Sequence, residues 1–231
     1  MIIGSGLIAK AFHKYKNNTD VLIFASGVSN SKSCSISDCN REEQLARKIL
    51  NGNNNQPLVV YFSSCSLSST RLKNDTYHKH KKKMEGLFKV LSDRRIIFRL
   101  PNVVGNNANP DTLFYYLVNK IRQQEEFDLW TKNKRNIIDI DDVVKVASYI
   151  IDNNIFEGEV INIANINDNT VDDIVISISK YFEIQANFSV VEYADNYKID
   201  TSKIKSIVKK LNVKFGNEYL DNIVRKYCEK S

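Results

Sequence analysis

A tyrosine and a lysine stand four positions apart near the start of the segment "TYHKHKKKMEGLFKVLSD" (76–93). Apolar residues of this segment recur at helical spacing, namely Met84, Leu87, Phe88 and Leu91. A helix is therefore predicted, and Tyr77 and Lys81 share one of its faces. A lysine ammonium beside a phenol favours the phenolate, so we expect a lowered pKa for Tyr77. Such a tyrosine can exchange a proton with a substrate hydroxyl or carbonyl while a nicotinamide exchanges hydride.

A serine pair, Ser63 and Ser64, ends the apolar run "PLVVYFSS" (57–64), which precedes that helix. The run is typical of a buried strand, and a serine at its carboxyl end could hold the same substrate oxygen as Tyr77. The alternative is that the lysines form an ordinary helix face exposed to solvent. The Tyr-x-x-x-Lys spacing would then have arisen by chance, as it easily does in a lysine-rich segment. The position of the pair directly after a serine-terminated strand favours the catalytic interpretation.

A glycine-rich turn lies at the start of the sequence, in "MIIGSGLIAKAF" (1–12). The residues from Gly4 to Ala9 have the spacing of a dinucleotide-binding turn, with Ala9 in place of the last glycine. Two glycines let a pyrophosphate approach the backbone, and the N-terminus of the following helix faces it. A single motif of this kind predicts a phosphate site only together with the rest of the pattern.

The elements around these residues alternate between strand and helix over the first two-thirds of the chain. Strands are predicted at 1–3, 20–26, 57–64 and 94–105, and helices near 7–16, at 41–51 and at 76–93. This alternation predicts a parallel α/β sheet that binds ligands at the carboxyl ends of its strands. Further along, we expect helices at 109–124, 139–153 and 170–182, strands at 158–164 and 189–194, and two helical segments split at Gly216. Pro110 and Asp111 are expected to open the first of these helices, and Asp141 to cap the second.

Composition narrows the class of protein. The 231 residues are 42% hydrophobic and carry a net charge of +6, which allows one core with a small appendage. The sequence shows neither a run of about 20 apolar residues nor a leader, so we expect a cytoplasmic protein without a membrane partner. The basic charge suits a small anion such as a nucleotide diphosphate, and we expect no nucleic-acid partner because no stacking pattern accompanies the lysines. The four cysteines, Cys34, Cys39, Cys65 and Cys228, have no zinc-site spacing, so we expect reduced structural thiols and no metal.

In order and spacing these segments resemble the extended short-chain dehydrogenase/reductase family, specifically its NAD-dependent sugar-nucleotide epimerase/dehydratase branch. The resemblance runs over nearly the whole chain, through "GSGLIA", "DVLIFASG", "VVYFSSCS", Tyr77 with Lys81, "RLPNVVG", "KRNIIDIDDVVKV", "GEVINIA" and "DTSKIK". It implies a Rossmann-like parallel sheet with helices on both faces and a small C-terminal substrate-binding lobe. Residues 1–105 would form the nucleotide-binding core, and residues 106–231 would complete the sheet and form the lobe, in one compact unit.

The resemblance also implies roles for individual residues. The catalytic residues would be Ser64, in preference to Ser63, together with Tyr77 and Lys81. NAD or NADP would be bound by Gly4, Gly6, Leu7, Ile8, Ala25, Ser26, Tyr77, Lys81, Pro101 and Val103. The substrate would be held by Ser64, Asn102 and Arg135, the arginine gripping the diphosphate. Two structural alternatives stay open: Arg135 could pair with Asp139 or Asp141, and Asn102 could merely shape a strand end.

Two departures from the family pattern stand out. Only ten residues separate Ala9 from Asp20, so the second strand, its helix and the third strand of the family are missing. The acidic residue that binds the adenosine ribose is lost with them, and it is also absent if "DVLIFAS" is instead the second strand, because that strand ends in Ala25 and Ser26. By the first assignment the truncated sheet would begin at an edge strand of three residues, with the family order 1-4-5-6 and further strands beyond. The segment between Ser64 and Tyr77 is also short, and Cys65 and Ser66 occupy the positions of the Asp-Glu pair of the 4,6-dehydratases. We therefore do not expect dehydratase activity.

Two functions of different classes follow. The first is an NAD(P)-dependent oxidoreductase or epimerase acting on a nucleotide-linked sugar, as a monomer or homodimer. The second is a non-catalytic relative that senses nucleotides or acts as a scaffold. The family commonly dimerises through the helix that bears Tyr-x-x-x-Lys, and Lys79, Lys82 and Lys83 would repel their symmetry mates there.

Overall fold

The computed structural model describes residues 1–28, 34–52, 56–69, 75–106, 109, 111–131, 133–192 and 196–228. Its centre is a five-stranded sheet of order β1-β2-β3-β4-β9, in which every neighbouring pair is parallel. The strands are β1 (Ile2–Ile3), β2 (Val21–Phe24), β3 (Leu58–Ser64), β4 (Arg95–Leu100) and β9 (Val160–Asn162). β1 lies at the edge, as predicted, and β9 brings a late segment of the chain into the sheet. The expected truncated Rossmann-like sheet is confirmed.

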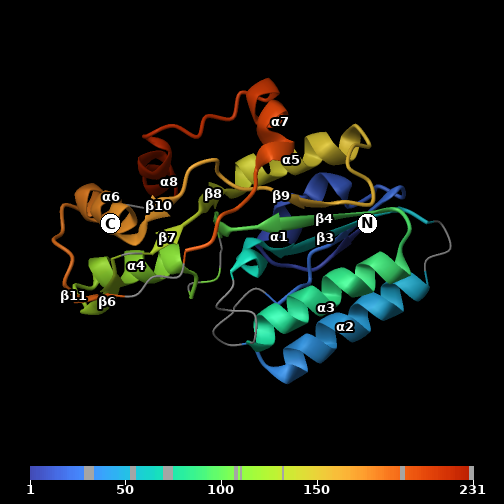
Figure 1. Ribbon diagram of the computed structural model, residues 1–231, viewed down its shortest axis with the longest axis horizontal. Helices are drawn as coiled ribbons and strands as arrows, with labels where there is room; N and C mark the ends of the chain where they lie inside the picture. Colours follow the sequence, from blue (N-terminus) through green and yellow to red (C-terminus); the bar gives the residue numbers. More distant parts are fainter. Residues whose placement is uncertain are drawn as a thin grey trace.

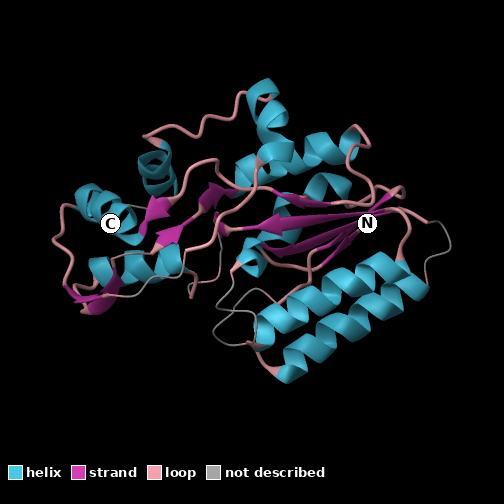
Figure 2. Ribbon diagram, in the orientation of Figure 1, coloured by secondary structure: helices cyan, strands magenta, loops and turns pink. Residues whose placement is uncertain are grey.

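Helices cover both faces of this sheet (Figure 1, Figure 2). α2 (Ile36–Asn51) and α3 (Thr76–Leu91) lie side by side on one face, where Met84 and Phe88 pack on Leu22 and Tyr61. α1 (Leu7–Ala11), α5 (Ile140–Asp152) and α7 (Lys205–Lys210) lie on the other face. Successive strand residues point to opposite faces, so strands buried on both sides are apolar throughout. No helix in the described ranges is long and apolar enough to cross a membrane.

The C-terminal lobe lies beyond the end of the sheet, on the left of Figure 1. Its helices are α4 (Leu113–Arg122), α6 (Val171–Phe182) and α8 (Tyr219–Tyr227), which share a second apolar core. Short strand pairs surround it: β5 (Asn102–Val104) with β8 (Ile137–Asp139), β6 (Phe127–Trp130) with β11 (Phe188–Val191), and β7 (Lys134–Arg135) with β10 (Asn169–Thr170). The expected small lobe is therefore present.

Several predicted boundaries were wrong for local reasons. The strand expected over 94–105 divides into β4 and β5, because the chain leaves the sheet at Pro101 and Asn102 pairs with β8 instead. Asp139, rather than Asp141, caps α5 by accepting a hydrogen bond from the Asp141 amide. Asp111 does not open α4, which begins at Leu113 after the N-cap residue Thr112, and Pro110 lies outside the described residues.

Candidate active site

The three predicted catalytic residues meet at the carboxyl end of β3. Ser64 is the last residue of that strand, and Tyr77 and Lys81 lie in the first turns of α3. Tyr77 and Lys81 are buried, with only 8% and 3% of their surfaces exposed. The Ser64 hydroxyl shares a hydrogen bond with the Ser66 hydroxyl at 2.7 Å and lies near enough to Tyr77 to affect its pKa, and the Lys81 Nζ atom lies 5.9 Å from the centre of the Tyr77 ring. Ser63 precedes Ser64 on the strand and so points to the other face of the sheet.

The acidity of Tyr77 differs from the expectation. Burial raises the pKa of Tyr77 to about 12, and the nearby Ser64 hydroxyl only partly opposes that rise. The Glu42 carboxylate raises the pKa further. The predicted lowering was wrong for the free protein, because burial of the phenol raises the pKa of Tyr77 most, and the positive charge of Lys81 is matched by a carboxylate that the spacing of Tyr77 and Lys81 did not reveal.

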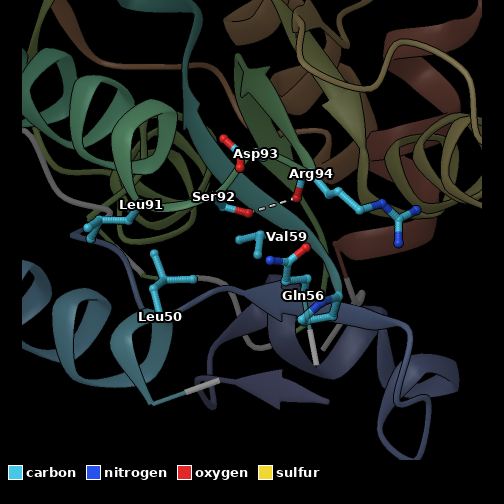
Figure 3. A pocket seen from close by; sticks show the side chains of 8 residues that line it. Leu50, Gln56, Val59, Leu91, Ser92, Asp93 and Arg94 are labelled. Atoms are coloured by element: carbon cyan, nitrogen blue, oxygen red, sulfur yellow. Dashed lines mark hydrogen bonds between the residues drawn. The ribbon is translucent and has the colours of Figure 1, made fainter. Parts of the chain in front are cut away.

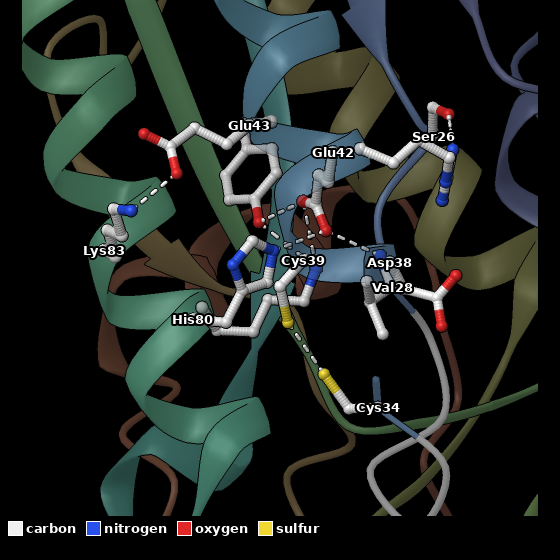
Figure 4. Close-up of polar contacts among 12 residues, drawn as sticks. Ser26, Val28, Cys34, Asp38, Cys39, Glu42, Glu43, His80 and Lys83 are labelled. Carbon is white, nitrogen blue, oxygen red and sulfur yellow. Dashed lines mark hydrogen bonds and ion pairs between the residues drawn. The ribbon is translucent and has the colours of Figure 1, made fainter. Parts of the chain in front are cut away.

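That carboxylate belongs to Glu42 on α2, which is fully buried. It accepts hydrogen bonds from the Tyr61 hydroxyl at 2.8 Å and from the Val28 amide at 2.7 Å. His80 Nε2 lies 2.9 Å and Lys81 Nζ 3.5 Å from its oxygens. Lys81 also donates to the Tyr61 hydroxyl at 3.1 Å. Figure 4 shows Glu42 between His80 and the Val28 amide. We call these five residues the Glu42 cluster.

Opposing effects set the charge states in the Glu42 cluster. Burial by itself raises the pKa of Glu42, but the His80 hydrogen bond, the Lys81 charge and the Val28 amide outweigh it and hold the pKa at about 2. Burial lowers the pKa of Lys81, and Glu42 opposes that change. Glu42 is therefore ionised at neutral pH, and its negative charge balances the positive charge of Lys81 in a buried ion pair.

Sequence reasoning missed the Glu42 cluster, although one sign of it was present. Glu42 falls on the apolar stripe of its helix, three, four and seven positions before Leu45, Ala46 and Ile49. A charged residue at such a position must find a partner in the fold. His80 follows Tyr77 by three positions and shares its helix face.

Other contacts fix α3 on the sheet beside these groups. Arg99 of β4 makes two hydrogen bonds to Glu85 of α3, at 2.8 and 2.7 Å. Lys81 is also enclosed by the segment that follows β2, because a Cβ atom added to Gly27 would lie 2.8 Å from Lys81 Nζ. The backbone after β2 thus lies directly against the lysine, and only glycine fits there without displacing it.

The glycine turn lies at the carboxyl end of β1. Gly4 has φ +128°, and a Cβ atom there would lie 2.4 Å from the Ala25 carbonyl oxygen. Gly6 is the N-cap residue of α1, and an added Cβ would meet no atom within 4 Å. Gly4 thus allows β1 and β2 to approach each other, whereas Gly6 borders open space of the kind a phosphate group needs.

The remaining residues predicted to bind the cofactor have structural partners too. Leu7, Ile8, Ala25 and Val103 pack against the core on the α1 face. The Ser26 hydroxyl accepts a hydrogen bond from Arg41 of α2 at 3.3 Å. Pro101 is half-buried at the carboxyl end of β4, between the sheet and β5.

The two residues predicted to contact the substrate lie toward the lobe. The side-chain amide of Asn102 donates to the Asn136 carbonyl at 3.0 Å, so this residue does shape a strand end. Arg135 lies in β7 and donates to the Lys134 carbonyl at 2.8 Å. Both Asp139 and Asp141, its alternative partners, accept hydrogen bonds from Lys226 of α8.

A pocket elsewhere in the described part of the chain has no connection with this site. It is lined by Leu50, Gln56, Val59, Ser92 and Arg94, among others, at the amino ends of β3 and β4 (Figure 3). The opposite ends of the same strands carry the predicted site residues, so this pocket does not belong to the candidate active site.

Comparisons with known proteins concern the family and the fold of this chain. Residues 59–164 match the model of the NAD dependent epimerase/dehydratase family. The comparison with curated proteins gave no match.

Solved structures with this fold include enzymes that act on nucleotide sugars. A dTDP-glucose 4,6-dehydratase from Bacillus anthracis in complex with NAD is 17% identical, with a TM-score of 0.69 over 97% of this chain and 78% of that chain. A UDP-glucuronic acid 4-epimerase from Bacillus cereus, in complex with UDP-glucuronic acid and NAD, is 16% identical, with a TM-score of 0.72 over 93% and 76%. A UDP-N-acetylglucosamine 4-epimerase from the same organism is 16% identical, with a TM-score of 0.72 over 99% and 84%.

These neighbours align with nearly all of this chain, whereas part of each of them lies outside the alignment. That difference agrees with a sheet that begins at β1 and continues directly to the strand resembling the family's fourth. The predicted resemblance is thereby confirmed: residues 59–164 match the NAD-dependent epimerase/dehydratase family, and the chain has a truncated form of its fold.

Proposed function

We propose that this protein is an NAD(P)-dependent oxidoreductase or epimerase acting on a nucleotide-linked sugar. The observation that carries the proposal is the meeting of Ser64, Tyr77 and Lys81 at the carboxyl end of β3. A non-catalytic protein has no need of these three residue types at one end of the same strand. Residues 1–105 would supply the nucleotide-binding core, and residues 106–231 the remaining strand and the substrate lobe.

Tyr77 would exchange the proton in this proposal. Because its pKa is raised to about 12, the phenol is protonated at neutral pH and can donate to a sugar carbonyl oxygen. The Ser64 hydroxyl, which shares a hydrogen bond with Ser66 in the free protein, would hold the same oxygen. Lys81 would stabilise the phenolate left after proton donation, in competition with Glu42. A bound nicotinamide would supply or accept the hydride.

The residues of this chain fit one half of a dinucleotide. The open space beside Gly6 would receive the pyrophosphate, and Pro101 and Val103, which follow β4, would lie beside the nicotinamide. The adenosine half has less support, because β2 is followed by Ala25 and Ser26 rather than by an acidic residue. We propose that the adenosine is exposed or is covered by a second subunit, and NAD and NADP both stay candidates.

The substrate proposal draws on a neighbour and on two residues. The Bacillus cereus 4-epimerase binds UDP-glucuronic acid. Here Arg135, suited to bidentate contact with a diphosphate, would hold the nucleotide side of such a substrate, and Asn102 would contact it nearby. Both lie where the sheet meets the lobe.

Substitution of Tyr77 by phenylalanine tests the proposal. We expect Tyr77→Phe to reduce turnover of a sugar nucleotide by about 10²–10⁴-fold, the usual contribution of a positioned acid or base. Tyr149→Phe is the matched control, because its hydroxyl accepts a hydrogen bond from Lys210 on an exposed surface. Turnover is followed with a panel of sugar nucleotides and both cofactors. Equal turnover in the Tyr77 variant and the unaltered protein would remove this mechanism.

A non-catalytic, nucleotide-sensing protein or scaffold is the second candidate. The charge state of the site favours it, because Lys81 is paired with Glu42 rather than with Tyr77, and the pKa of Tyr77 is raised. Calorimetry separates the two functions. Binding of NAD or NADP by the unaltered protein supports the enzyme, whereas heats no larger than dilution for both cofactors support the scaffold.

A further inference from the structure

Two cysteines at the start of α2 bring their sulfur atoms unusually close. Cys34 Sγ and Cys39 Sγ lie 3.0 Å apart, and Figure 4 shows the two side chains pointing toward each other. Both thiols are free. A disulfide requires an S–S distance of about 2 Å, so the bond would form after a sulfur movement of about 1 Å. Cys34 lies in the segment just before α2 and Cys39 in the first turn of that helix, so the path of the chain into α2 brings the two thiols together.

We propose that Cys34 and Cys39 are a thiol–disulfide pair, a site of reversible oxidation beside the Glu42 cluster. Cys34 is half-buried and open to a small reagent, whereas Cys39 is buried behind it. This arrangement suits an attacking thiol and a resolving thiol. The sequence alone led us to expect only structural thiols, because a spacing of five is not a recognised redox motif.

The other two cysteines lack this arrangement. The Cys65 thiol is fully buried and donates to the Arg99 carbonyl at 3.2 Å. Cys228 is buried in the lobe, near the end of α8. The distance between the sulfur atoms of Cys34 and Cys39 therefore separates this pair from the remaining thiols.

A small-molecule disulfide is the oxidant class that we propose. The Cys34 thiolate attacks one sulfur of the reagent, forming a mixed disulfide and releasing one thiolate. The Cys39 thiolate then attacks the Cys34 sulfur, forms the Cys34–Cys39 bond and releases the second thiolate. In total two cysteine thiols lose two protons and two electrons, and the reagent disulfide becomes two thiols.

The surroundings of Cys34 give the reaction a characteristic pH dependence. Burial and the contact with Cys39 raise the pKa of the Cys34 thiol to about 12. The groups facing it are Asp38 and Cys39 on α2, with Tyr77 and Lys81 on α3. Only the thiolate reacts, so the rate rises about tenfold per pH unit between pH 7 and pH 9. A modification of this kind responds to sustained rather than brief oxidation.

The bond would form close to the predicted catalytic groups. Cys39 precedes Glu42 by three residues, so the two side chains share a face of α2, one turn apart. Glu42 in turn holds Lys81 and Tyr61. The proposal does not rest on the proposed enzyme, because it is read from the thiols themselves.

Oxidised glutathione and mass spectrometry test the inference on the full chain. We expect the folded protein to lose two free thiols, to become lighter by two hydrogen atoms, and to yield a peptide cross-linked between 34 and 39. Dithiothreitol restores both thiols. Cys228→Ser is the matched control and reacts as the unaltered protein does, whereas Cys34→Ser forms no internal disulfide.

Two results would overturn the proposal. One is retention of all four free thiols after the treatment that oxidises a small dithiol completely. The other is a glutathione adduct that persists on Cys34 of the unaltered protein, as it does in Cys39→Ser, since Cys39 then fails to resolve it. If Cys39→Ser does not fold, Cys39→Ala serves, and far-ultraviolet circular dichroism confirms the fold of each variant before oxidation.

Discussion

The middle and the edge of the sheet are built in different ways. In the middle, β3 runs for seven residues between two parallel neighbours, and the Glu42, His80 and Lys81 side chains beside it are buried. At the edge, β1 has two residues and one neighbour, and α1, which follows the glycine turn, has five residues. The middle thus holds the proposed catalytic residues in a buried setting, whereas the edge holds the glycine turn that we propose as half of a cofactor site.

This difference shows how the truncated sheet keeps a charged site in its interior. The Lys81 ammonium cannot remain buried without a partner, because an uncompensated buried charge is strongly destabilising. The partner, Glu42, comes from the helix that lies beside α3. The face that carries the proposed catalytic residues therefore has its buried charges paired within the protein, whereas the proposed cofactor half-site at the edge would need a ligand or a partner to complete it.

Loss of the Glu42 charge is the largest change that we expect. In Glu42→Gln, Lys81 stays buried without a counter-charge, and we expect the free energy of unfolding to fall by about 3–5 kcal/mol. Urea unfolding of the variant and the unaltered protein measures this difference.

The neighbouring residue provides the matched control. Glu43 also carries two cationic partners, Lys83 at 2.5 Å and Arg47 at 2.9 Å, but both partners are exposed. For Glu43→Gln we expect a loss of about 1 kcal/mol or less, because exposed ion pairs contribute little. Similar losses in the two variants would contradict the central role of Glu42.

The pH dependence of stability gives a second measure of the contribution of the Glu42 charge. The pKa of Glu42 is about 2 in the folded protein, below its ordinary value of 4.5. A carboxyl with a lowered folded pKa stabilises the protein above the unfolded pKa and loses that contribution as the pH falls through the folded value. We expect about 3 kcal/mol of stability at neutral pH to disappear between pH 4.5 and about pH 2.

Comparison with Glu42→Gln separates the contribution of Glu42 to this pH dependence from the contributions of the other carboxyl groups. The stability difference between the unaltered protein and Glu42→Gln, measured at a series of pH values, should shrink across that window. A difference that stays constant from pH 6 to pH 3 would show that the Glu42 charge does not stabilise the fold.

The sequence predicted the fold well where each element carries its own pattern. The strand–helix alternation, the edge position of β1 and the meeting of Ser64, Tyr77 and Lys81 all follow from local periodicity and from the parallel order of strands. The division between β4 and β5 did not follow, because the pairing of Asn102 with Ile137 is a long-range contact.

The electrostatics of the site could not be predicted in the same way. The i, i+4 spacing of Tyr77 and Lys81 predicts that they share a face, but the charge that reaches Tyr77 depends on Glu42, which lies 39 residues from Lys81. The closeness of Cys34 and Cys39 depends likewise on where the chain enters α2. Such contacts are set by the fold and leave little trace in local sequence.

At the edge of the sheet, alanine at Gly4 should disturb the fold itself. The backbone there has φ +128°, and the new Cβ would lie 2.4 Å from the Ala25 carbonyl oxygen. We expect the free energy of unfolding to fall by about 1–3 kcal/mol, because the strain must be relieved by separating β1 from β2. Thermal unfolding measures it, and an unchanged melting temperature would show that the edge strand contributes nothing.

Alanine at Gly6 should leave the fold intact and affect only the ligand. Gly6 has φ −76°, a conformation open to any residue, and an added Cβ meets no atom within 4 Å. Stability should change by about 1 kcal/mol or less. If the open space receives the cofactor pyrophosphate, the same methyl group should weaken binding of NAD or NADP about tenfold, or 1.4 kcal/mol. Calorimetry on Gly6→Ala therefore separates the two roles of the turn, and undiminished affinity would place the cofactor elsewhere.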